Sequence, residues 1–212
     1  MVIIVPAIIA KSFRDLQGKV RIAETFPTCR WVQIDIMDGK FVPARSVSVR
    51  VVSKIRTPLH LELHLMVTHP EEILDQILKT HAGRVIVHAG SSSNLHGLFD
   101  ALKQAKIKGA IALNPENPVA MIKPYLTKID SVLLLSVQPG SYGAKFLPSV
   151  YGKIRAIRKM DRHLPVAIDG GVSLENAVKL IRAGADRLSV GSRIFLAEDP
   201  RASYRQFKNI VS

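Results

Sequence analysis

The sequence predicts a single parallel (β/α)₈ barrel, the TIM-barrel fold of the α/β class, formed by residues 1–212 as one domain. Short runs rich in Val, Ile and Leu are continuously apolar, which is typical of parallel strands buried on both faces. Amphipathic segments that suit helices separate these runs. The unit recurs about every 26 residues, a spacing that favours a closed barrel over an open doubly wound sheet.

Eight apolar runs are the predicted strands, and the amphipathic segments between them are the predicted helices. The first run is not followed by a GxGxxG motif, which argues against a dinucleotide-binding fold. No Ser/Gly-rich linker or low-complexity tract interrupts the series. The predicted strands lie near residues 2–9, 31–36, 59–66, 84–88, 109–113, 131–137, 165–168 and 187–190, and the clearest predicted helices are 13–25, 70–80, 95–105, 150–159 and 174–183.

The charge of the chain indicates an anionic partner without identifying it. The formal net charge of +13 favours either nucleic acid or a sugar phosphate. The basic residues are spread along the sequence and form no RGG tract, no Lys/Arg block and no basic stripe interleaved with aromatic residues. We therefore expect a solvated basic surface, a small phosphorylated ligand, and no specific nucleic-acid partner.

Neither a membrane-spanning segment nor an internal disulfide bond is expected. No apolar stretch approaches the roughly 20 residues that a membrane span requires. The first ten residues lack a basic n-region and a small-residue cleavage site, so they are predicted to be a strand and not a signal peptide. Cys29 is the only cysteine and cannot form an internal disulfide. A cytoplasmic location is expected.

Polar residues gather where the predicted strands end, which is where the chemistry of a (β/α)₈ barrel is found. Side chains alternate along a strand, so residues two apart share a face. By this rule the second and third runs each present polar side chains to the barrel interior, and the seventh run ends in an aspartate. The residues concerned are Gln33, Asp35 and Met37, then Glu62, His64 and Met66, and finally Asp169.

Two opposed carboxylates suit an epimerisation, because one can remove a proton from carbon while the other returns a proton to the opposite face. A divalent metal ion between Asp35 and Asp169 could stabilise the enediolate. Each residue also has a simpler interpretation: an aspartate can cap a turn, and His64 can be a core histidine with a backbone partner. The convergence of all of them on one rim favours a site.

Glycine-rich loops after the last three runs indicate a phosphate site, because backbone N–H groups at such turns can bind an anion. Glycine alone is weak evidence, since it also simply makes turns. The three loops together carry the prediction. They contain Gly140 and Gly143 within residues 138–143, then Gly170 and Gly171, and then Gly191 and Ser192.

With these residues in view, the chain resembles the ribulose-phosphate 3-epimerase family over essentially its whole length. The most specific matches are the segments DIMDGKFVP at 35–43 and HLMV at 64–67. Shorter matches follow at 87–89 (VHA), 112–115 (ALNP), 137–140 (VQPG), 169–171 (DGG) and 190–192 (VGS).

The resemblance implies a barrel of the ribulose-phosphate-binding type. It also implies a cytosolic enzyme of the pentose phosphate pathway that interconverts D-ribulose 5-phosphate and D-xylulose 5-phosphate. Such enzymes use a divalent metal, with zinc the first expectation and iron or manganese the alternatives, and they often form homo-oligomers. Asp35 and Asp169 match the acid/base pair and two metal ligands, and His64 matches a third. Met37 and Met66 match residues beside the enediolate, and Gly143, Gly170, Gly171, Gly191 and Ser192 match the phosphate cradle.

The departures from the family pattern fall in the site. Gln33 stands where the family has its fourth metal ligand, a histidine, and a neutral amide oxygen is a poorer zinc donor than imidazole. Metal affinity is therefore expected to drop. Ala10 and Ala44 replace a serine and an asparagine near the sugar, while Gln138 and Gly90 replace an asparagine and an acidic residue.

Two functional hypotheses follow from these departures. The chain is either a divergent active epimerase, with a three-ligand metal, a different metal or none, or a catalytically altered or inactive relative. Under the second hypothesis, the protein binds a phosphorylated sugar or other phosphometabolite but does not convert it. The retained pair of aspartates favours the first hypothesis, and the missing histidine favours the second.

Overall fold

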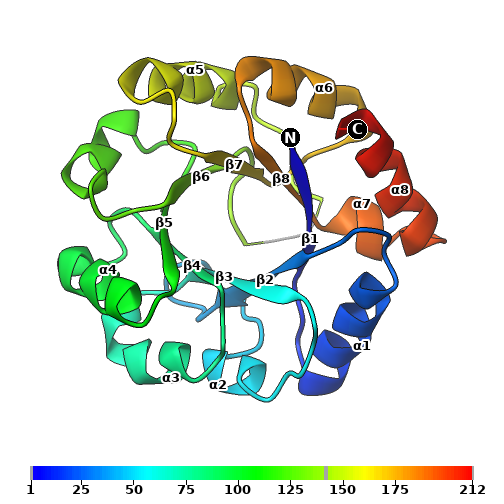
Figure 1. Ribbon diagram of the computed structural model, residues 1–212, viewed down its shortest axis with the longest axis horizontal. Coiled ribbons are helices and arrows are strands. Elements are labelled where there is room, and N and C mark those ends of the chain that lie inside the picture. Colours follow the sequence, from blue (N-terminus) through cyan, green and yellow to red (C-terminus); the bar gives the residue numbers. More distant parts are fainter. Residues whose placement is uncertain (1, 141–142, 212) are drawn as a thin grey trace.

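The computed structural model describes residues 2–140 and 143–211, and its eight strands form a closed barrel. Every strand pairs in parallel with its neighbours in sequence, and β8 closes the ring against β1 (Figure 1). The predicted fold is therefore confirmed. The strands are β1 (Ile3–Ile8), β2 (Trp31–Met37), β3 (His60–Met66), β4 (Arg84–His88), β5 (Lys108–Leu113), β6 (Ser131–Leu135), β7 (Val166–Asp169) and β8 (Arg187–Val190).

Helices surround the strands as an outer ring (Figure 1). None of the helices within residues 2–140 and 143–211 is long and apolar enough to span a bilayer. The α-helices are α1 (Phe13–Glu24), α2 (Val49–Val52), α3 (Leu74–Leu78), α4 (Leu95–Gln104), α5 (Val150–Met160), α6 (Leu174–Ala183), α7 (Ser192–Phe195) and α8 (Pro200–Val211). The described residues also form the 3₁₀ helices η1 (Pro70–Ile73) and η2 (Val119–Tyr125).

The segment predicted as one helix over residues 70–80 is divided in the structure. His69 has a left-handed backbone with a φ of 50°, and Pro70, which has no N–H group, begins the 3₁₀ helix η1. The chain continues into α3, which spans only Leu74–Leu78. In η2, by contrast, Pro124 lies inside the element, and its missing N–H group disfavours a continuous α-helix.

The inside of the barrel has an apolar half and a polar half. A separate apolar cluster comes from neighbouring strands β4 to β7 and consists of Ile86, Ala110, Ala112, Leu133, Leu135 and Ala167. The buried polar side chains of the strands are two each from β2, β3, β4 and β8 and one each from β6 and β7, namely Gln33, Asp35, Glu62, His64, Arg84, His88, Arg187, Ser189, Ser131 and Asp169. This division leaves the polar groups of one half facing one another.

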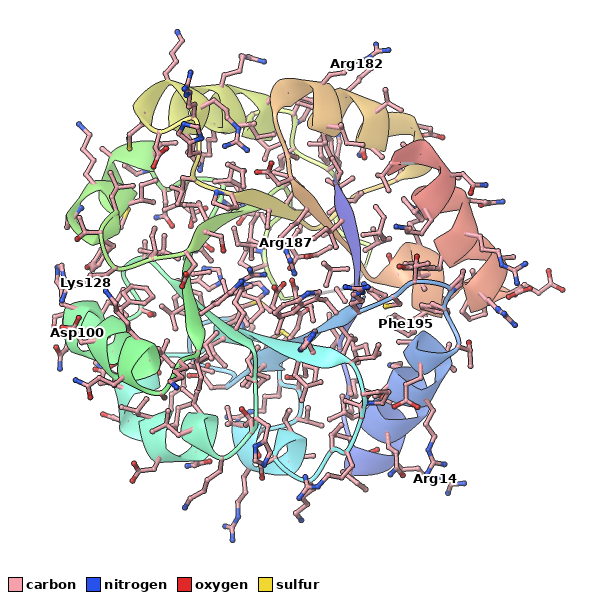
Figure 2. All side chains as sticks on the ribbon, viewed as in Figure 1. Arg14, Asp100, Lys128, Arg182, Arg187 and Phe195 are labelled. Atoms are coloured by element: carbon pink, nitrogen blue, oxygen red, sulfur yellow. The ribbon has the colours of Figure 1, made fainter. Side chains whose placement is uncertain are left out.

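A buried ion cluster fills the end of the barrel where the strands begin. Glu62 Oε2 accepts hydrogen bonds from Arg84 Nη1 at 2.6 Å and from Arg187 Nη2 at 2.8 Å. Both guanidinium groups lie over the ring of Trp31, at 5.0 and 5.1 Å from its centroid. Figure 2 shows Arg187 inside the ring of strands, whereas Arg14 and Arg182 extend outward from α1 and α6. The cluster thus joins β2, β3, β4 and β8.

Replacing Glu62 tests the contribution of this cluster to stability. Glu62→Gln leaves two buried guanidinium groups without a counter-charge, so we expect the free energy of unfolding to fall by about 3–5 kcal/mol. For a chain of this size each kcal/mol lowers the melting temperature by roughly 2–4 °C. Calorimetry should be compared with Glu24→Gln, an exposed position on α1. Equal melting temperatures for the two variants would show that the ion cluster does not stabilise the fold.

Candidate active site

Buried polar side chains from four strands meet at the end of the barrel where the strands finish. Strand pairing sets Asp35 beside His64 and Asp169 beside Ser189. Gln33 is fully buried two residues before Asp35 on β2. The structure therefore brings together the residues that strand alternation predicted to converge from β2, β3 and β7.

Asp35, His64 and Asp169 direct donor atoms at a common point. His64 Nδ1 lies 3.1 Å from Asp35 Oδ1 and 3.2 Å from Asp169 Oδ2. One donor atom from each residue lies within 4.8 Å of the other two. Two carboxylates and one imidazole form a suitable donor set for zinc, iron or manganese, and three protein ligands are the usual number in a catalytic zinc site. This buried group could hold a divalent metal ion.

Gln33 lies between the two aspartates and acts as a hydrogen-bond donor. Its Nε2 atom donates to Asp35 Oδ1 and to Asp169 Oδ2, each at 2.7 Å. Its Oε1 atom accepts a 2.7 Å hydrogen bond from Ser189 Oγ. The amide nitrogen has no free electron pair for a metal ion. In this orientation Gln33 does not supply the fourth ligand.

The two aspartates and two histidines influence one another's protonation. Burial raises the pKa of Asp35, and the nearby charge of Asp169 raises it further. Burial alone would lower the pKa of His64, but hydrogen bonds and charge from Asp169 and Asp35 outweigh burial and raise this pKa to about 9. Burial and the charge of His64 hold the pKa of His88 well below its ordinary value. At neutral pH, a protonated His64 can therefore donate to a neutral His88 across the 2.9 Å between their Nε2 atoms.

The two predicted methionines lie beside this centre. Met37 and Met66 are buried and pack with Val42 in a small apolar cluster. Met66 lines the same cavity as Asp35, His64 and Asp169. Met37 lines an adjoining hollow with Ala44, one of the positions where the sequence departs from the family pattern.

The glycine-rich loops form the rim of the cavity. Gly170 and Gly171 both have positive φ, at 91° and 64°. A Cβ atom on Gly170 would lie 2.3 Å from Val137 Cγ2, so only glycine fits this close approach. Ser141 and Tyr142 of the predicted phosphate loop lie outside the described residues. The predicted phosphate residues that line the cavity are Gly140, Gly143, Gly170, Gly171, Gly191 and Ser192.

Comparison with known proteins identifies the family. The model of the ribulose-phosphate 3-epimerase family matches residues 3–195. The chain belongs to this family of isomerases. The match confirms the resemblance that the sequence motifs indicated.

Curated epimerases match over most of the chain. A chloroplastic ribulose-5-phosphate-3-epimerase of Arabidopsis thaliana is 37% identical over 93% of this chain and 73% of its own length. The ribulose-phosphate 3-epimerase of Bacillus subtilis is 32% identical over 98% of this chain and 99% of its own.

Solved structures of other enzymes share the barrel. A 3-hexulose-6-phosphate synthase superposes with a TM-score of 0.76 at 17% identity, covering 100% of both chains. A KGPDC from Streptococcus mutans superposes with a TM-score of 0.77 at 12% identity over 99% of this chain and 97% of its own. At these identities the likeness concerns the fold alone.

Three residues at this epimerase-family site, His88, Ser189 and Arg193, were not among the predicted site residues, and His88 Nε2 lies 2.9 Å from His64 Nε2. Ser189 orients the amide of Gln33, and Arg193 lines the cavity directly after Gly191 and Ser192. Alternation along β8 places Ser189 on the same face as Arg187, which is a signal that could have indicated an inward hydroxyl. A positively charged side chain directly after a Gly-Ser pair at the start of a helix is likewise a signal that could have indicated Arg193 as a site residue.

Asp38 stabilises, through hydrogen bonds, the loop that follows β2 and lies next to the cavity. Its carboxylate accepts hydrogen bonds from the N–H groups of Lys40, Phe41 and Thr68 and from the Thr68 hydroxyl, at 2.7 to 3.0 Å. The loop places Phe41 against His88, with ring centroids 4.7 Å apart. Burial alone would raise the pKa of Asp38, but the donors from Thr68, Lys40 and Phe41 outweigh it and hold this pKa below its ordinary value.

Asp38 should make the stability of the fold depend on pH. Because its folded-state pKa is lowered, its contribution is fully present above the ordinary aspartate pKa and is lost as the pH falls through the lowered value. We expect Asp38→Asn to reduce the free energy of unfolding at pH 7 by about 1 kcal/mol. Below about pH 4 the difference should shrink. Urea unfolding of Asp38→Asn and of the exposed control Asp75→Asn across this pH range measures the effect. A deficit that does not change with pH would contradict it.

Proposed function

We propose that the chain interconverts D-ribulose 5-phosphate and D-xylulose 5-phosphate by inverting the configuration at C3. The observation that carries this proposal is the pair of buried aspartates that share one donor group. Asp35 on β2 and Asp169 on β7 come from opposite sides of the barrel (Figure 1) and both lie 2.7 Å from Gln33 Nε2. They line one cavity, where a substrate carbon could face both carboxyl groups.

The proton transfers follow from this pair. The C2 carbonyl acidifies the proton on C3, so one carboxylate can remove it and leave an enediolate. The other carboxyl group returns a proton to the opposite face of C3, and the two groups exchange roles in the reverse direction. A divalent ion held by Asp35, His64 and Asp169 would stabilise the negative charge of the enediolate.

The rim of the cavity suits the phosphate of the same sugar. The loops with Gly170, Gly171, Gly191 and Ser192 bring backbone close to the opening, and Arg193 adds a positive charge there. Met37 and Met66 would provide an apolar wall beside the enediolate. Zinc is the proposed metal, with iron or manganese as alternatives. Homo-oligomer formation and a cytoplasmic location stay predictions.

Turnover is the direct test of this function. The purified protein should convert D-ribulose 5-phosphate to D-xylulose 5-phosphate, and zinc, manganese or iron supplied after chelation should raise the rate. A coupled assay for D-xylulose 5-phosphate measures it. If folded protein gave no turnover with any of these metals, a relative that binds the sugar phosphate without reaction would be the better description.

Asp169→Asn separates acid/base chemistry from binding. The amide keeps the size of the side chain but cannot accept the C3 proton, so kcat should fall at least about 10³-fold. Binding of D-ribulose 5-phosphate, measured by calorimetric titration, should weaken much less, because the phosphate contacts are unchanged. Asp75→Asn, on the exposed side of α3, is the matched control. Near-normal turnover of Asp169→Asn would remove Asp169 from this role.

A further inference from the structure

Four side-chain atoms surround one small volume at the floor of the cavity. Around this volume, Gln33 Nε2 lies 2.7 Å from an oxygen of each aspartate and 3.4 Å from His64 Nδ1. His64 Nδ1 lies 3.1 and 3.2 Å from the same oxygens. Ligand atoms of a tetrahedral ion with bonds of about 2.0 Å are separated by about 3.3 Å. Gln33 thus occupies the fourth corner of a site shaped for an ion, but it presents a donor there.

Hydrogen bonding fixes the orientation of the Gln33 amide. Two carboxylate oxygens accept from its nitrogen, and the Ser189 hydroxyl donates to its oxygen. Turning the amide over would place its oxygen against both carboxylates, where no hydrogen atom lies between them. Gln33 and Ser189 are both almost fully buried, so water cannot readily replace either partner. Ser189 is therefore a positioning residue for Gln33.

Strand β1 permits this contact by carrying small or branched apolar residues between the two partners. Gln33 is in register with Ala7 on β1, and Ser189 is in register with Val5. Both of these β1 residues are buried. The short side chain of Ala7 leaves space for an amide from β2 to reach a hydroxyl on β8.

We propose that Gln33, oriented by Ser189, holds Asp35 and Asp169 together without a metal ion, so that the metal-free site is a stable form of this protein. A divalent cation then binds weakly, because it must displace the amide nitrogen from between the carboxylates. If Asp35, His64 and Asp169 held a cation, the amide could turn its oxygen inward, and Ser189 could then accept from the amide nitrogen. A hydroxyl can serve both forms because it donates as well as accepts.

The first test is the unfolding temperature and metal content of the unmodified protein. Protein dialysed against EDTA should melt within about 2 °C of protein supplied with zinc, and the same dialysis should remove bound metal. Mass spectrometry of the metal and scanning calorimetry give the two readouts. One tightly retained ion per chain, or a loss of about 5 °C or more on removing it, would overturn the proposal.

The second test replaces the amide. Gln33→Met has a similar length but no donor, so the EDTA-treated variant should melt at least about 5 °C below the unmodified protein, and zinc should restore much of the difference. Gln33→His provides an imidazole in the same place and should tighten zinc binding at least about 100-fold, measured by competition with a chromophoric chelator. Gln104→Met, on the exposed surface of α4, is the control.

Either variant can overturn the proposal alone. A Gln33→Met protein as stable without metal as the unmodified one would show that the amide does not hold the aspartates. Unchanged zinc affinity in Gln33→His would show that position 33 lies outside the ion site, and this variant keeps the test open if Gln33→Met does not fold. Neither readout depends on turnover, so a failure of the proposed epimerase reaction would be seen separately.

Discussion

Closing eight parallel strands into a barrel leaves a narrow interior in which each inward polar side chain needs a partner among the other inward side chains. The barrel meets this constraint in part, since Glu62 Oε1 and the Nε atoms of Arg84 and Arg187 have no hydrogen-bond partner among the described residues. Glu62 pairs with two arginines at the end where the strands begin. On β2, in register with Glu62, Gln33 directs its amide to two carboxylates and a hydroxyl. The apolar cluster on β4 to β7 packs in the same interior.

This need for buried partners explains why a glutamine at position 33, where the family pattern has a histidine, depends on a second residue. An inward amide presents both a donor and an acceptor, and leaving either buried and unpaired costs about 1–3 kcal/mol. The aspartates satisfy the nitrogen, but only a donor from another strand can satisfy the oxygen. Ser189 provides that donor from β8, which becomes a near neighbour of β2 only when the barrel closes. Gln33 and Ser189 therefore form one functional unit.

Much of the fold could be predicted from the sequence because parallel strands buried on both faces leave a plain pattern of apolar runs. The same regularity gave the inward direction of Asp35 and His64, since alternation needs no knowledge of the neighbours. The division of residues 70–80 was missed because the apolar spacing continues across Ile73 and Leu74, where the 3₁₀ helix η1 ends and α3 begins. The bond from Ser189 to Gln33 could not be predicted, because it joins residues 156 positions apart through barrel closure.

Structural neighbours at 12 and 17% identity share this barrel but carry other names, so the chemistry depends on side chains at the strand ends and not on the frame. In that setting a bound metal ion would do two things at once: it would hold the carboxylates in place and supply positive charge. The Gln33 amide can do only the first, because it is neutral. The second can come from His64, whose pKa is raised to about 9 by the same aspartates, or from an ion that exchanges with the amide. Under the proposal made above, separating the two tasks would keep Asp35 and Asp169 assembled whether or not a metal ion is present.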